Sequence, residues 1–105
     1  MKIKLHVHAI ALLAAAAATG PLAYAQDAAS NVRGMVATCA NCHGTDGRSV
    51  GAVPGLAGMD KAYLAQQMQD FKAGKRPATI MHQIAKGYTD EQIDQLAGYF
   101  SALRK

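Results

Sequence analysis

MVATCANCHG, residues 35–44, contains the only two cysteines of the chain and a histidine directly after the second. Several chemistries use cysteines at this spacing: a zinc site, a redox dithiol, a structural disulfide, a cysteine nucleophile, and covalent attachment of a haem. Which of them applies decides both the fold and the function, because the rest of the chain offers few other chemically distinctive residues.

Four of these chemistries fit the sequence poorly. A zinc site needs four ligands, whereas Cys39, Cys42 and His43 supply three at most. A thioredoxin-like dithiol belongs to a βαβ unit, and no alternating strand pattern is present. A disulfide between Cys39 and Cys42 would close too short a loop to stabilise much. A cysteine nucleophile would leave the second cysteine unexplained.

The pattern C-x-x-C-H is typical of c-type haem attachment, and this chemistry accounts for every residue of the motif. Cys39 and Cys42 lie about one helical turn apart, so both sulfurs can reach the vinyl groups on one edge of a porphyrin. His43 then supplies the proximal nitrogen to the iron. The motif therefore predicts one covalently bound haem c per chain.

Residues 1–25 have the layout of a secretory signal peptide. Lys2 and Lys4 precede an apolar run over 9–18, a helix-breaking T-G-P follows, and small residues precede a cleavage site after Ala25. The run is shorter than the roughly 20 apolar residues that span a bilayer. We expect cleavage after Ala25, export to the periplasm and a soluble mature protein.

Residues 26–105 then form one small monohaem domain. Removing Lys2 and Lys4 from the 11 Lys+Arg leaves 9 against 7 Asp+Glu, a net charge of +2. This small charge, without a dense basic run, argues against nucleic-acid binding. A chain this short buries a limited part of its surface and needs a staple such as a cofactor.

The helical signals predict an all-α fold with three to four helices around the haem. Asp60 is a good N-cap and Gly74 a good stop, and Thr89 with Gln92 forms a capping box. The glycine-rich segment 44–58 indicates an ordered loop. The expected helices run from Ser30 or Asn31 to about Thr38, and over 61–73, 80–86 and 90–103, the last burying Ile93, Leu96, Ala97, Phe100 and Leu103.

The haem iron of an electron carrier needs a second axial ligand. The candidates are Met35, Met59, Met68, Met81 and His82. Met68 falls on the apolar stripe of a helix, where core packing is the usual role. Met81 follows a proline-containing break and can swing over the haem, whereas His82 should point to the surface or the haem rim. We therefore predict His43/Met81 ligation, which raises the reduction potential relative to a bis-histidine haem.

Other residues have supporting roles in this interpretation. The Pro54 carbonyl is within reach of the free N–H of His43, although Pro54 could equally be a turn proline. We expect a haem wall made by Leu56, Leu64, Ile80 and Phe100. Arg48, Lys75 and Arg76 could pair with the haem propionates or form a docking rim, with plain solvated charge as the alternative. Gly34 and Gly98 could let the first and last helices cross closely, with Tyr99 or Phe100 against the first.

The sequence resembles class I cytochromes c over roughly residues 33–105. The resemblance rests on C-A-N-C-H-G, P-G-L-A-G, T-I-M and Y-T-D-E-Q-I-D-x-L-A-x-Y-F. The stretches C-A-N-C-H-G-T-D-G-R-S-V-G-A-V-P-G-L-A-G and G-K-R-P-A-T-I-M-H-Q-I-A-K-G-Y are similar to the cytochrome subunits of flavocytochrome c sulfide dehydrogenases. The resemblance implies haem attachment at Cys39 and Cys42, axial ligation by His43 and Met81, and a flavoprotein partner that oxidises sulfide.

This resemblance implies one-electron transfer by Fe(III)/Fe(II) cycling, as an electron-transfer subunit and not as a catalytic chain by itself. Some relatives carry two haem domains, whereas this chain has one CxxCH motif. Two alternatives stay open. The protein could diffuse freely between other redox partners, or, if Met81 leaves the iron open, act as a haem enzyme or gas sensor.

Overall fold

The computed structural model describes residues 22–105, with side chains from residue 29 onward. Four α-helices follow one another along the chain: α1 (Leu22–His43), α2 (Lys61–Lys72), α3 (Met81–Lys86) and α4 (Asp90–Ala102). No strand occurs within these residues, so the all-α prediction is confirmed there. Most of the predicted signal peptide, residues 1–21, lies outside the described part. None of the described helices is long and apolar enough to cross a membrane.

The first helix is much longer than predicted. We expected it to begin at Ser30 or Asn31 and to end near Thr38, whereas α1 extends over Leu22–His43. Residues 22–30 contain four alanines and neither glycine nor proline, and alanine has the highest helix propensity. Nothing interrupts the helix until Gly44, whose positive φ of 79° ends it. The attachment motif therefore forms the last turn of α1.

Helix α2 begins and ends at its predicted signals. The Asp60 side chain accepts a hydrogen bond from the Tyr63 N–H at 2.8 Å, which caps the first turn. At the other end, Ala73 is the C-cap and Gly74 follows with φ 72°. The predicted span of 61–73 is thus correct to one residue.

Helices α3 and α4 also agree with the sequence. In α4, Thr89 Oγ1 accepts from the Gln92 N–H at 3.2 Å, and Gln92 Oε1 accepts from the Thr89 N–H at 2.9 Å. This is the predicted capping box. Helix α3 begins one residue later than predicted, because Ile80 is its N-cap, and ends at Lys86 as predicted, with Gly87 as its C-cap.

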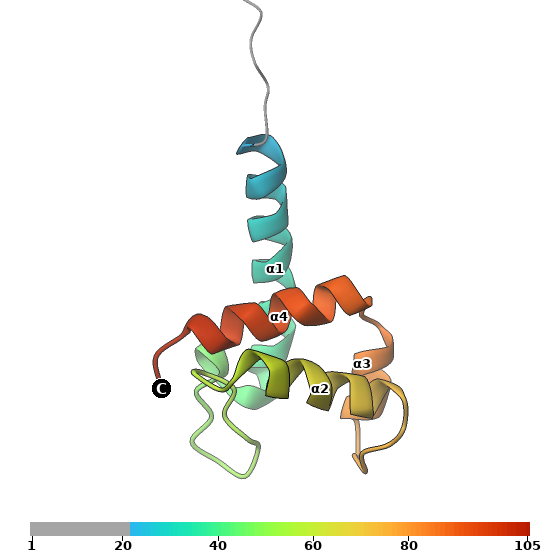
Figure 1. Cartoon of the computed structure of the whole chain (residues 1–105). Helices are drawn as coiled ribbons and strands as arrows, with labels where there is room; N and C mark the ends of the chain where they lie inside the picture. The colour runs from blue at the N-terminus through green and yellow to red at the C-terminus, as the bar shows by residue number, and fades with distance from the viewer. Residues whose placement is uncertain (1–21) are drawn as a thin grey trace, which may run out of the picture.

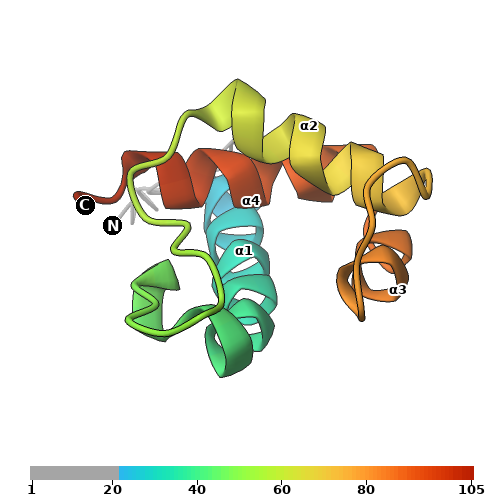
Figure 2. The same cartoon turned by 90° about the horizontal axis from the view of Figure 1, so that it is seen from below.

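The helices enclose one small core. Helices α2 and α4 run side by side in opposite directions, α1 crosses α4, and the short α3 lies at the C-terminal end of α2 (Figures 1 and 2). Residues from three helices form the buried cluster: Met35, Val36, Leu64, Leu96, Ala97 and Phe100. Ile93 is also fully buried, and Leu103, predicted to be buried, is only partly so.

The predicted close crossing through Gly34 and Gly98 is wrong. A Cβ on Gly34 would have no atom within 4 Å, and one on Gly98 would meet only the Lys61 side chain of α2, at 3.7 Å. Phe100 nevertheless shares the buried cluster with Met35 and Val36, as expected, because side chains and not glycine contacts fill the space between α1 and α4.

Gly34→Ala should therefore stabilise the protein. Alanine in place of glycine inside a helix contributes about 0.5–1 kcal/mol, and the added methyl group meets open space. Urea unfolding of the haem-loaded protein, followed by circular dichroism, measures the change. A loss of stability instead would mean that α1 is closely packed at Gly34.

Candidate functional site

A cavity of about 1110 Å³ lies between α1, the loop after it, α2 and α3. In Figure 2, the C-terminal end of α1 and the short helix α3 lie apart from each other, both beside α2 and α4. The lining is mainly apolar, and its volume exceeds the roughly 300–1,000 Å³ of a pocket for a drug-sized ligand. The cavity therefore suits a large, mainly apolar group.

The attachment motif forms one wall of this cavity. Cys39, Cys42 and His43 all line it, because the last turn of α1 presents residues three and four positions apart on one side. The two cysteines are free thiols, not joined in a disulfide. Burial raises the pKa of the Cys39 thiol above its ordinary value. A thioether formed at this sulfur would carry no charge, which suits a half-buried position.

The ring of His43 is held by the loop that follows. His43 Nδ1 lies 2.6 Å from the Pro54 carbonyl oxygen. A carbonyl only accepts hydrogen bonds, so Nδ1 carries the proton and Nε2 keeps a free lone pair for a metal. The expected contact between His43 and Pro54 is thus present.

The loop reaches this position through a tight turn. Gly47 is buried with φ 69°, and its carbonyl accepts from the Leu56 N–H at 2.7 Å and the Ala57 N–H at 3.2 Å. Asp46 also has a positive φ, 54°, and accepts from the Tyr99 hydroxyl at 3.2 Å. Burial, with the Asp46 carboxylate, raises the pKa of Tyr99. These contacts tie the loop to α4 and bring Pro54 beside His43.

Helix α2 contributes one face to the cavity. Its lining residues repeat at three- and four-residue spacing: Tyr63, Leu64, Gln67, Met68 and Phe71. Gln67 was missed by the sequence reasoning because it is polar, although its spacing from Tyr63 and Phe71 places it on this face. Met68, interpreted from sequence as core filler, lines the cavity instead.

Three methionines border the cavity: Met59, Met68 and Met81. Met35, the other described candidate, is buried in the helical core. Met59 also packs against the core cluster, whereas Met81 is the first residue of α3. His82 does not line the cavity; it is half-buried, and its Nδ1 is enclosed without a hydrogen-bond partner. The expectation that His82 lies at the surface or the haem rim stays a prediction.

The other predicted wall residues are found at the cavity. Leu56, Leu64, Ile80 and Phe100 all line it. Ile80, at 55% exposure, is the most open of the four. The structure also adds Thr38 and Tyr88, which come from distant parts of the sequence and had no motif to mark them.

Only one of the three candidate cationic residues reaches the cavity. Arg76 lines it, with its guanidinium 4.7 Å from the centre of the Phe71 ring and hydrogen-bonded to Gln67. Arg48 instead pairs with Asp46 at 3.3 Å and donates to the Arg104 carbonyl at 3.0 Å. Lys75 is exposed and away from the lining. A propionate-binding role therefore fits Arg76 alone.

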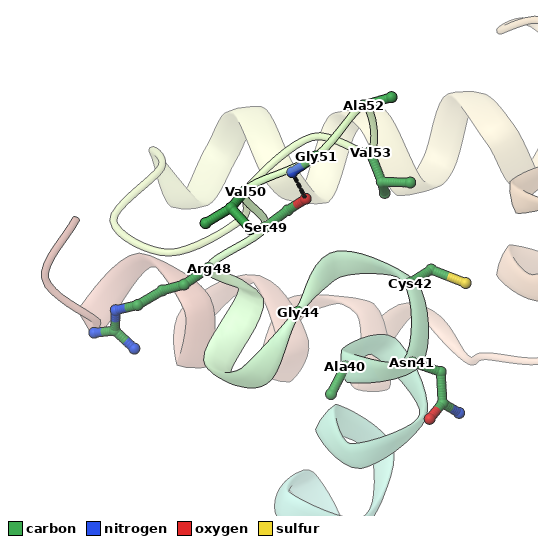
Figure 3. Close-up of a pocket in the computed structure, with 10 residues that line it drawn as sticks. All are labelled: Ala40, Asn41, Cys42, Gly44, Arg48, Ser49, Val50, Gly51, Ala52 and Val53. Carbon is green, nitrogen blue, oxygen red and sulfur yellow. Dashed lines mark hydrogen bonds between the residues drawn. The ribbon is translucent and has the colours of Figure 1, made fainter.

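A second, smaller pocket of about 290 Å³ lies between the end of α1 and residues 48–53. Figure 3 shows this segment folded over Gly44 and Cys42, with the Arg48 side chain directed away. The turn is closed by the Gly51 N–H, which donates to Ser49 Oγ at 3.3 Å. Because Cys42 lines both pockets, this segment borders the outer side of the attachment motif.

The comparisons with known proteins agree with this geometry. The cytochrome c family profile matches residues 18–104. The cytochrome subunit of sulfide dehydrogenase from Chlorobaculum tepidum is 42% identical over 92 residues, which cover 85% of this chain and 84% of that protein. The chain belongs to the cytochrome c family. It is a c-type cytochrome, an electron carrier with covalently bound haem c.

Other relatives are longer than this chain. A thiosulfate dehydrogenase electron acceptor from Stutzerimonas stutzeri is 40% identical, over 85% of this chain and 41% of its own length. Cytochrome c4 from Azotobacter vinelandii is 36% identical, over 89% and 49%. A solved structure of Acidithiobacillus ferrooxidans cytochrome c4 superposes with a TM-score of 0.60 and 45% identity, over 62% of this chain and 38% of that one. The chain thus spans less than half the length of these three relatives.

The residues at the cavity fit a haem c. Two thiols for its vinyl groups, an imidazole nitrogen and thioether sulfurs all border one apolar space. When bound, the haem supplies the Fe(III)/Fe(II) couple. The chain would contribute an apolar surrounding and a His43 ring whose Nε2 is free to bind a metal.

Proposed function

We propose that Cys39 and Cys42 bind the haem covalently, that His43 and Met81 are the axial ligands, and that the protein transfers single electrons without bond-making catalysis. The observation that carries this proposal is the shared cavity, because His43 from α1 and Met81 from α3 line the same apolar space. The hydrogen bond from His43 Nδ1 to the Pro54 carbonyl supports the axial role of His43, because it leaves Nε2 free to bind the iron.

We further propose that the electron donor is a flavoprotein that oxidises sulfide, with this chain as its haem subunit. The similarity to the cytochrome subunit of sulfide dehydrogenase, over 84% of that protein, supports this partner. The second candidate is a freely diffusing carrier, which the similarity to a thiosulfate dehydrogenase electron acceptor favours. Co-purification with a larger flavin-containing chain supports the first, and elution as a monomer supports the second.

The proposed location is the periplasm, after removal of residues 1–25 as a signal peptide, with residues 26–105 as the monohaem domain. The lysines and apolar run at the N-terminus support export. The family match begins at residue 18 and α1 at Leu22, so this cleavage would leave a chain that starts within α1.

One spectroscopic experiment tests the coordination. The protein, purified after export, should have the intact mass of residues 26–105 plus one haem. Its reduced form should have a sharp α-band and should not respond to carbon monoxide, because Met81 fills the sixth position. The oxidised form should have a weak band near the red edge of the spectrum. Carbon monoxide binding by the native reduced protein would instead favour a haem enzyme or gas sensor with an open site.

A further inference from the structure

Two hydroxyl groups join opposite parts of the cavity wall. Tyr88 Oη lies 2.9 Å from Thr38 Oγ1, across 50 positions of sequence. Thr38 immediately precedes Cys39 in α1, and Tyr88 follows α3 directly after Gly87. Both side chains line the cavity. The contact therefore connects the wall that carries the attachment motif with the segment that carries Met81.

The direction of this hydrogen bond follows from the neighbouring contact. Thr38 Oγ1 donates its single proton to the Met35 carbonyl at 2.7 Å. It must therefore accept from Tyr88, whose hydroxyl is the donor. Because the bond to Met35 fixes the Thr38 oxygen against its own helix, α1 presents a fixed acceptor to Tyr88.

The main chain of Tyr88 is held from a second side. Lys72 Nζ donates to the Tyr88 carbonyl at 2.8 Å and pairs with Asp90 at 2.9 Å. Gln69 Nε2 donates to the same Asp90 oxygen at 3.0 Å. The hydrogen bonds from Lys72 and Gln69 lower the pKa of Asp90, so its carboxylate remains charged at neutral pH. Tyr88 is thus tied to α2 through its main chain and to α1 through its hydroxyl.

Helix α3 needs such external restraints. It has six residues, and no side chain caps its N-terminus at Ile80. An isolated helix of this length is unstable in water, so the position of Met81 depends on what holds the ends of the segment. Ala85, fully buried, is one restraint; the contacts of Tyr88 provide another.

We propose that Tyr88 and Thr38 form a clasp, the Thr38–Tyr88 clasp, that positions α3 so that Met81 stays on the iron and exogenous ligands stay off it. Both are positioning residues, acting through Met81. The inference rests on the proposed His43/Met81 ligation and adds the device that maintains it.

The test is imidazole binding to the oxidised haem protein, because imidazole reaches the iron only when Met81 leaves. Tyr88→Phe keeps the ring and removes the hydroxyl, and Thr38→Val removes the acceptor with little change in volume. A hydrogen bond of ordinary net strength corresponds to about a two- to tenfold change in an equilibrium constant. Each variant should bind imidazole about two- to tenfold more tightly, and the double variant no more tightly than either single one.

Ser101→Ala is the matched control. It removes a hydroxyl that donates to the Gly98 carbonyl at 3.1 Å in α4, and Ser101 neither lines the cavity nor contacts Tyr88. Its imidazole affinity should equal that of the wild type. Unchanged affinity in Tyr88→Phe, or an equal increase in Ser101→Ala, would overturn the clasp while leaving the ligation intact. A wild type without the methionine-dependent red-edge band would overturn both.

Discussion

Replacing Met81 by alanine should abolish the weak red-edge band of the oxidised protein and let the reduced protein bind carbon monoxide. The thioether sulfur is the proposed sixth ligand, and its loss leaves water or an external ligand to occupy that position. A neutral sulfur favours Fe(II), so the reduction potential should fall by on the order of 0.1 V, within the roughly 0.8 V range that axial ligands set. Spectroelectrochemical titration measures both the band and the potential.

Met59→Ala and Met68→Ala are the matched controls, because both methionines also line the cavity. Each should lower stability through lost packing, by up to about 2–5 kcal/mol, yet keep the red-edge band. If Met59→Ala or Met68→Ala lost the band while Met81→Ala kept it, the methionine replaced in the variant that lost the band would be the ligand. Comparing the three variants therefore distinguishes loss of the axial ligand from loss of packing around the cavity.

Gly47→Ala should destabilise the protein by about 2–5 kcal/mol. The left-handed backbone conformation costs a non-glycine residue about 1–2 kcal/mol, and overpacking costs about 1–3 kcal/mol. Gly47 has φ 69°, and an added Cβ would lie 2.9 Å from Leu56 Cβ and from the Phe100 ring. Denaturant unfolding of the haem-loaded protein measures the loss.

Gly51→Ala provides the comparison for this turn. Gly51 lies in the same loop, has no atom within 4 Å of an added Cβ and lacks a positive φ. Its substitution should change the free energy of unfolding by no more than about 0.5 kcal/mol. A similar loss in both variants would contradict the argument from backbone conformation and contact at Gly47.

Local sequence signals predicted correctly the helix caps and the protein class, which depend on a few adjacent residues. The Asp60 cap and the Thr89–Gln92 capping box were correct because such hydrogen bonds span three residues. The CxxCH motif predicted the c-type cytochrome class, which the family comparison confirms. The axial role of Met81 stays a prediction, since three methionines reach the cavity.

Other features depended on contacts between distant parts of the chain, and only the tertiary structure decided them. No local rule shows that Gly34 faces open space, that Arg48 pairs with Asp46 and the Arg104 carbonyl away from the large cavity, or that Tyr88 meets Thr38. The sequence by itself determined the cofactor and the caps of α2 and α4, because these follow from residue type and short spacing. Which side chains line the cavity followed from the packing of the helices, because packing brings together residues that the sequence keeps far apart.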